Sequence, residues 1–135
     1  MAYNIIDIEG IGPVFAEKLN AAGINTTDDL LAKGGTSAGR KELADATGID
    51  NEKILTWVNH SDLHRIDGIA GQTSELMEAA GVDTVKELAT RNAANLAAKM
   101  EEVNTAKNLS GRVPSADQLQ KMIDQAKTLD QMVFH

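Results

Sequence analysis

The chain has 135 residues, 42% of them apolar, and it carries a net charge of −7. Its length and apolar content suffice for one small domain with a buried core, and the absence of cysteine excludes disulfides, thiolate nucleophiles and cysteine-bound metals. The negative charge opposes long-range attraction to nucleic acid. No apolar run approaches the roughly 20 residues of a membrane span and no signal-peptide pattern opens the sequence, so we expect a cytoplasmic protein.

The first predicted elements surround a glycine-rich turn. Asn4 is positioned to cap a short helix over residues 5–8. Residues 8–13, Ile-Glu-Gly-Ile-Gly-Pro, form the turn itself, which we call the first hinge. Because the first turn of a helix tolerates proline and glycine commonly ends a helix, Pro13 and Gly23 predict the bounds of the next one.

Three more helices are predicted in the first half of the chain. Serine, threonine and aspartate are preferred N-caps, and glycine favours the left-handed conformation that ends helices. We expect these helices to begin at Thr26 or Thr27, at Ser37 and at Asp50, and to end at 33–36, at Gly48 and at His60. Strand-like alternation of apolar and polar residues is absent, which favours an all-α fold.

The second half of the sequence repeats the first. Residues 66–71, Ile-Asp-Gly-Ile-Ala-Gly, form a second hinge. Residues 4–31 match residues 62–89 at 9 of 28 aligned positions without a gap. In this alignment Asp62 takes the place of Asn4, so we expect Asp62 to cap the helix that precedes the second hinge.

The remaining sequence predicts two helices and a tail. Residues 92–108 indicate a longer helix, and Ser115 is positioned to open the last one. A single hairpin cannot bury its own apolar face, so the hairpins must pack on further helices. We therefore expect two tandem hairpin halves, residues 1–61 and 62–129, packed as one compact all-α domain and followed by a tail at 130–135.

Each hinge resembles the helix-hairpin-helix motif, in which an apolar-Gly-apolar-Gly sequence joins two short helices. Gly10, Ile11 and Gly12 match that pattern, whereas Ala70 replaces the second glycine in the second hinge, which predicts a less free backbone there. A wider resemblance is to the bacterial DUF4332 family, which is itself similar to tandem helix-hairpin-helix domains of nucleic-acid enzymes. It covers nearly the whole chain, through the segments at 8–13, 26–31, 57–60, 79–85, 88–92, 103–104 and 112–115.

The resemblance implies a binding site. In helix-hairpin-helix domains that bind DNA, hinge N–H groups contact phosphates without reading the sequence, and hinge carbonyls can hold a monovalent cation. The alternative is that the glycines only permit a tight turn and close packing of helices. Carried over to this chain, with the nearest basic side chains added, the implied nucleic-acid site comprises Gly10, Ile11, Gly12, Lys18, Arg65, Gly68, Ile69, Ala70 and Gly71.

The residues that follow the hinges leave two functional hypotheses open. Val14, Phe15, Gln72 and Thr73 stand where DNA-binding hairpins usually carry basic side chains. The first hypothesis is therefore a nucleic-acid backbone contact that is weak and strongly salt-sensitive. The second is a protein-interaction, scaffold or self-association module that uses an acidic helical surface and binds no nucleic acid.

Charge is divided unevenly between the halves. Residues 1–62 carry five basic and ten acidic side chains, and residues 63–135 carry eight and ten. A polyanion is therefore more readily accepted by the second half. Neither half contains a nucleophile with a base, a phosphate-binding loop or a zinc-protease motif, so we expect a non-enzymatic protein without a cofactor.

Two further side-chain patterns each have a functional and a structural interpretation. His60 and His64 have the i, i+4 spacing that can chelate a metal on a helix. An N-cap at Asp62 would break that helix, which favours solvated or capping histidines instead. Trp57 could stack on a base, but its spacing from Ile54 predicts a packing residue between the two halves.

Overall fold

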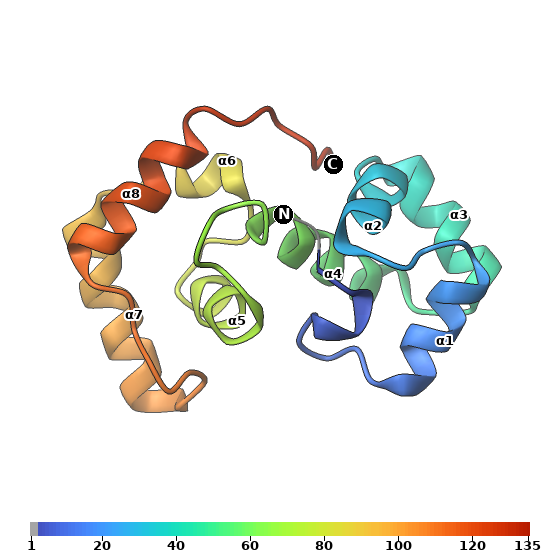
Figure 1. Cartoon of the computed structure of the whole chain (residues 1–135), viewed down its shortest axis with the longest axis horizontal. Helices are drawn as coiled ribbons and strands as arrows, with labels where there is room; N and C mark the ends of the chain where they lie inside the picture. The colour runs from blue at the N-terminus through green and yellow to red at the C-terminus, as the bar shows by residue number, and fades with distance from the viewer. Residues whose placement is uncertain (1–2) are drawn as a thin grey trace.

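The computed structural model describes residues 3–135, and its regular elements are helical (Figure 1). The predicted all-α fold is confirmed. No helix within these residues combines the length and apolar character needed to cross a membrane. In chain order the elements are the 3₁₀ helix η1 (Ile5–Asp7) and the α-helices α1 (Pro13–Ala21), α2 (Thr27–Gly34), α3 (Ser37–Thr47), α4 (Asn51–Leu63), α5 (Gly71–Ala79), α6 (Val85–Leu88), α7 (Ala93–Lys107) and α8 (Ala116–Ala126).

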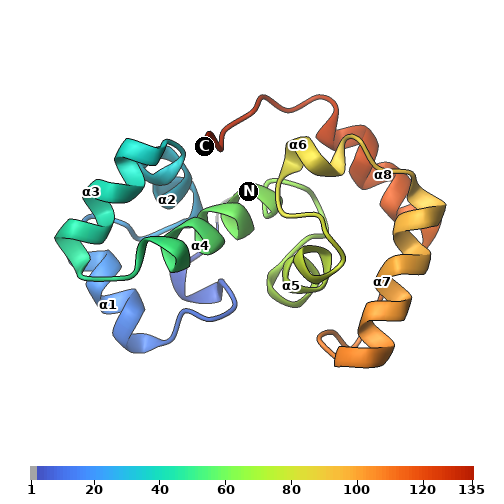
Figure 2. The same cartoon turned by 180° about the vertical axis from the view of Figure 1, so that it is seen from behind.

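The buried apolar side chains form two clusters. The first core gathers residues between Ile5 and Val58 together with Val133, and the second core runs from Leu63 to Ala126. Helix α4 connects them, lying between the group α1 to α3 and the group α5 to α8 (Figures 1 and 2). The predicted boundary between the halves therefore falls inside the last turn of a continuous helix.

Side-chain caps fix several helix starts. The Thr26 hydroxyl accepts from the Asp29 N–H at 3.1 Å, and the Asp29 carboxylate accepts from the Thr26 N–H at 3.2 Å. This reciprocal arrangement satisfies two N–H groups that have no acceptor within the helix. Helix α3 begins at Ser37, as predicted, and Thr36 caps it, because the Thr36 hydroxyl accepts from the Gly39 N–H at 3.1 Å.

Two predicted caps form no side-chain bond. Asp50 precedes α4 and Asn4 precedes η1, but neither side chain accepts from the helix that follows. The segment before η1 is held by backbone pairing instead, because Asn4 forms an isolated antiparallel bridge with Thr26. The Ile5 N–H also donates to the Asn25 carbonyl at 3.0 Å. This pairing fixes the chain that enters the first hinge.

Asp62 does not cap the helix before the second hinge, so that prediction is wrong. It lies in the last turn of α4, is only 2% exposed, and accepts from the Val85 N–H at 2.8 Å and from Arg65 Nη1 at 2.7 Å. A buried carboxylate requires partners for its oxygens, and these two contacts supply them. Consequently α4 continues unbroken through His60 to Leu63.

Residues 130–135 are not a free tail. They cross from the end of α8 to the first half in an extended path (Figure 1). Val133 is buried in the first core, and the Phe134 N–H donates to the Gly35 carbonyl at 2.7 Å. The physical reason is that Val133 buries its apolar side chain in the first core while the backbone of Phe134 bonds to the residue that ends α2.

His64 follows α4 at the contact between the two halves and is 2% exposed. Its Nε2 lies 3.4 Å from the Ser74 hydroxyl of α5, and its ring meets the Tyr3 ring edge-on at 5.0 Å. Its Nδ1 has no hydrogen-bond partner within the described residues. Burial, reinforced by His60 and opposed by Asp7, lowers the pKa of His64 to about 4.

The pKa of His64 predicts acid destabilisation. The neutral ring is favoured in the folded state and the unfolded pKa is 6.5, so this stability is present above pH 6.5 and is lost as the pH falls toward 4. Between pH 7.5 and pH 5.0 we expect a loss of about 2 kcal/mol in the free energy of unfolding, measured by urea denaturation. His64→Leu should remove this loss and exposed His135→Gln should not; an unchanged loss in His64→Leu would contradict the assignment.

Candidate functional site

The two hinges share one backbone conformation. Gly10 and Gly68 have φ of 92° and 87°, the left-handed region that favours glycine. Gly12 and Ala70 are the N-caps of α1 and α5, with extended φ of −91° and −129°. Because any residue adopts that conformation, Ala70 does not restrict the second hinge, contrary to the prediction.

The isoleucines of the predicted site are core residues. Ile11 is 5% exposed and Ile69 is not exposed at all. Each donates its backbone N–H to the isoleucine that opens its hinge, at 3.1 Å in the first hinge and 3.2 Å in the second. A ligand at either hinge would therefore meet backbone and flanking side chains, while the isoleucines hold the turn against the core.

The start of α5 offers more hydrogen-bond donors than the start of α1. The first bond of α5 runs from the Ser74 N–H to the Ala70 carbonyl at 2.9 Å, so the N–H groups of residues 71–73 have no acceptor within the helix. Helix α1 begins with Pro13, which has no N–H, so only residues 14 and 15 present such donors. The repeat is thus asymmetric at the atoms that would bind an anion.

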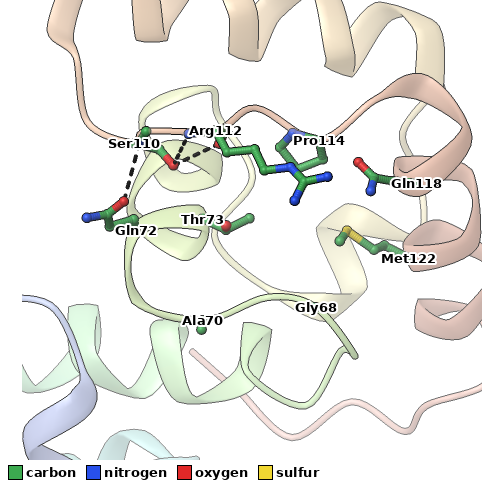
Figure 3. Close-up of a pocket in the computed structure, with 10 residues that line it drawn as sticks. Gly68, Ala70, Gln72, Thr73, Ser110, Arg112, Pro114, Gln118 and Met122 are labelled. Carbon is green, nitrogen blue, oxygen red and sulfur yellow. Dashed lines mark hydrogen bonds between the residues drawn. The ribbon is translucent and has the colours of Figure 1, made fainter.

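A pocket of about 560 Å³ opens at the second hinge. It lies between the start of α5, the loop at 110–114 and the first half of α8 (Figure 3). Ser110 fixes the loop, since its hydroxyl donates to the Arg112 carbonyl at 2.8 Å and its N–H donates to Asn104 Oδ1 at 2.9 Å. The lining residues are Gly68, Ala70, Gln72, Thr73, Ser110, Gly111, Arg112, Pro114, Gln118 and Met122.

Arg112 supplies the positive charge of this pocket. Its side chain is exposed and reaches from the loop toward Gln118 (Figure 3). It belongs to none of the ion pairs found among the described residues. Sequence reasoning missed Arg112, because only the tertiary fold brings residue 112 to a hinge that ends 41 residues earlier in the chain.

The structure places the two basic residues of the predicted site, Lys18 and Arg65, in different surroundings. Lys18 is exposed in the last turn of α1, more than one helical turn beyond the first hinge. The Arg65 side chain is 17% exposed and donates to Asp62 Oδ1 at 2.7 Å and to the Asp130 carbonyl at 2.9 Å. Both terminal nitrogens of Arg65 are therefore engaged within the protein.

Glu9 of the first hinge lies against the start of α5. A Cβ atom placed on Gly71 would come within 3.2 Å of Glu9 Oε1 and 3.3 Å of the Asp7 carbonyl. The hinges therefore pack on each other, and a side chain at position 71 would require its neighbours to shift by a few tenths of an ångström. A carboxylate near a helix N-terminus stabilises the helix, but it also repels any other anion that approaches the same donors.

The predicted packing role of Trp57 is confirmed, although it packs within the first core and not between the halves. It is 4% exposed, and its ring lies 5.1 Å from that of Phe15. His60 is buried and pairs with Glu78 at 2.8 Å. Across residues 3–135, no group of three or more His, Cys, Asp or Glu side chains is arranged to hold a metal ion.

A family model for a domain of unknown function, DUF4332, matches residues 9–129. The chain belongs to the DUF4332 family. The DUF4332 match includes the second hinge, the loop at 110–114 and α8, so every element of the Arg112 pocket lies within it. No curated protein and no solved structure matches the chain.

The hinge geometry predicts opposite effects for two glycine substitutions. Gly10→Ala should lower the free energy of unfolding by about 1 to 2 kcal/mol, because alanine is strained at φ of 92° and its Cβ would lie 3.4 Å from Trp57 Nε1. Gly12→Ala should be neutral or stabilising, since φ is extended and no atom lies within 4 Å of the new Cβ. Urea unfolding followed by Trp57 fluorescence measures both, and equal losses would contradict this account of the hinge.

Proposed function

We propose that this DUF4332 chain is a non-enzymatic, cytoplasmic binding module whose hinges are helix-hairpin-helix motifs and whose second hinge contacts nucleic-acid phosphates. The observation that carries the proposal is the exposed Arg112 guanidinium in a pocket formed with the start of α5. Of the three backbone N–H groups without helical acceptors, at residues 71–73, two belong to Gln72 and Thr73, which line the same pocket. Donors of both kinds suit a phosphate oxygen.

The chemistry of the pocket favours backbone contact over base reading. Besides Arg112 and the backbone, its polar groups are the hydroxyls of Thr73 and Ser110 and the amides of Gln72 and Gln118. The Ser110 hydroxyl already donates to the Arg112 carbonyl. The other groups can donate hydrogen bonds to phosphate oxygens, and contacts of this kind carry no sequence information. Exposed aromatic rings for base stacking are absent from the lining. Binding independent of sequence is the expected result.

The surrounding charge limits the affinity. The chain has a net charge of −7, and Glu9 lies beside the donors of α5. Both repel a polyanion, and the contact supplies few positive charges in compensation. We therefore expect weak binding at low salt that disappears as the salt concentration rises.

Arg112→Gln should weaken binding by roughly ten- to hundredfold, because a charge-assisted phosphate contact contributes on the order of 1.5 to 3 kcal/mol. The measurement is fluorescence anisotropy with labelled single-stranded, duplex and branched DNA and with RNA at low salt. The slope of log affinity against log salt should also fall by about one. Lys41→Gln, an exposed change of equal charge on α3, is the matched control. Failure of the unmodified protein to bind any of these at tens of micromolar would end the proposal.

Glu9→Gln should strengthen nucleic-acid binding about fivefold, since it removes a negative charge adjacent to the α5 donors, a repulsion on the order of 1 kcal/mol. Glu17→Gln, an exposed change of equal charge on α1, should have a smaller effect. The same anisotropy titration compares the two variants. Equal gains would indicate that only net charge matters, which contradicts a site at the second hinge.

A second candidate function is an acidic protein-interaction or scaffold module that binds no nucleic acid. It is favoured by the exposed carboxylates of Asp7, Glu9 and Asp67 around the hinges, together with the internal engagement of Arg65. A basic partner protein or a second copy would then replace the polyanion. Glu9→Gln distinguishes the functions, because it should weaken capture of a basic protein while strengthening capture of DNA.

A further inference from the structure

Residues 130–134, which we call the strap, join the two halves outside α4. On the second half, the Asp130 carbonyl accepts from Arg65 Nη2 at 2.9 Å, and Gln131 Oε1 accepts from Lys86 Nζ at 3.3 Å. On the first half, Val133 enters the core and is 4% exposed. The strap runs in an extended path from α8 to the end of α2 (Figure 1).

The receiving groove binds the backbone of the strap through a buried arginine. Arg40 is 4% exposed, and its Nη2 donates to the Phe134 carbonyl at 2.7 Å. Its Nη1 donates to the carbonyls of Gly34 and Gly35 at 2.9 and 3.1 Å. The Gly35 carbonyl also accepts the Phe134 N–H at 2.7 Å. Both backbone polar groups of Phe134 are therefore bound, while its side chain is left exposed.

Two glycines give the groove its shape. A Cβ atom on Gly35 would collide with the Met132 carbonyl of the strap, and one on Gly34 would lie 2.7 Å from Val58 Cγ2. A side chain at position 35 would therefore enter the space that the strap occupies, whereas one at position 34 would press against Val58 of the first core. The groove thus combines a close backbone approach, a buried donor for a carbonyl and an apolar position for Val133, which are the features of a site for an extended peptide.

We propose that this groove is a peptide-binding site that the chain's own residues 132–134 fill in the monomer, and that the same residues of a second copy fill it in a strap-exchanged dimer. Exchange recreates between two copies the contacts that residues 132–134 make with the groove, so complementarity to this occupant is already present. The connection is short: only residues 130–132 separate Leu129 on the second core from Val133 in the first. The groove's own strap is favoured in dilute solution because its effective concentration is on the order of millimolar.

Two full-length variants test the exchange by complementation. Val133→Asp removes the apolar side chain with which the strap enters the first core and leaves the groove open. Gly35→Ala blocks the groove and leaves the strap intact. When the two variants are mixed at about 100 micromolar, they should form a heterodimer, detected by native mass spectrometry and light scattering. This concentration is well below the effective concentration of a tethered strap, so an intact strap in an intact groove would not exchange. Each variant alone should stay monomeric. Absence of the heterodimer at ten times that concentration would overturn the proposal.

A peptide experiment covers the case in which Gly35→Ala does not fold. A synthetic peptide of residues 129–135 should bind the full-length Val133→Asp variant, measured by calorimetry. The same peptide with the Val133→Asp change should bind at least tenfold more weakly, and the unmodified protein should bind neither because its own strap fills the groove. Equal binding of the two peptides, or no binding at millimolar peptide, would overturn the site.

Discussion

The buried carboxylate of Asp62 is the contact on which the arrangement of the two halves depends. Its two oxygens hold the first N–H of α6 and the guanidinium of Arg65, and Arg65 in turn holds the Asp130 carbonyl. One side chain thereby connects the end of α4, the start of α6 and the strap. Removing one partner from a buried pair of this kind typically costs about 3 to 5 kcal/mol, a large part of the roughly 5 to 15 kcal/mol by which a small domain is stable.

The same contact is one reason why the two hinges differ in the side chains around them. Arg65 looks available for a phosphate in the sequence, yet Asp62 needs it as a structural partner. The first hinge keeps its acidic neighbours and begins its helix with Pro13, while the second keeps its backbone donors and acquires Arg112 from a distant loop. The two hinges thus share one backbone conformation, whereas the side chains around them differ. Fold and binding are thus separable properties.

Features that depend on a few neighbouring residues were predictable. The cap at Thr26, the left-handed Gly23 and the all-α composition each follow from local propensity. Asp62, Arg112 and Val133 were misjudged or missed because their partners lie elsewhere in the chain. A short polar residue before a helical pattern is a good N-cap signal, but a buried ion pair overrides it. No local pattern indicates that Arg112 and the second hinge line one pocket.

The strap also constrains the order in which the protein is completed. Arg40 and Phe134 are 94 positions apart in the chain, whereas the other members of the first core lie between Ile5 and Val58. On a ribosome the first half emerges long before Val133 exists, so its groove stays open and solvated until the strap is synthesised. Until then the Arg40 guanidinium lacks the Phe134 carbonyl, and the apolar position of Val133 in the first core is unfilled. The first half is therefore completed by the residues that follow the second half in the chain.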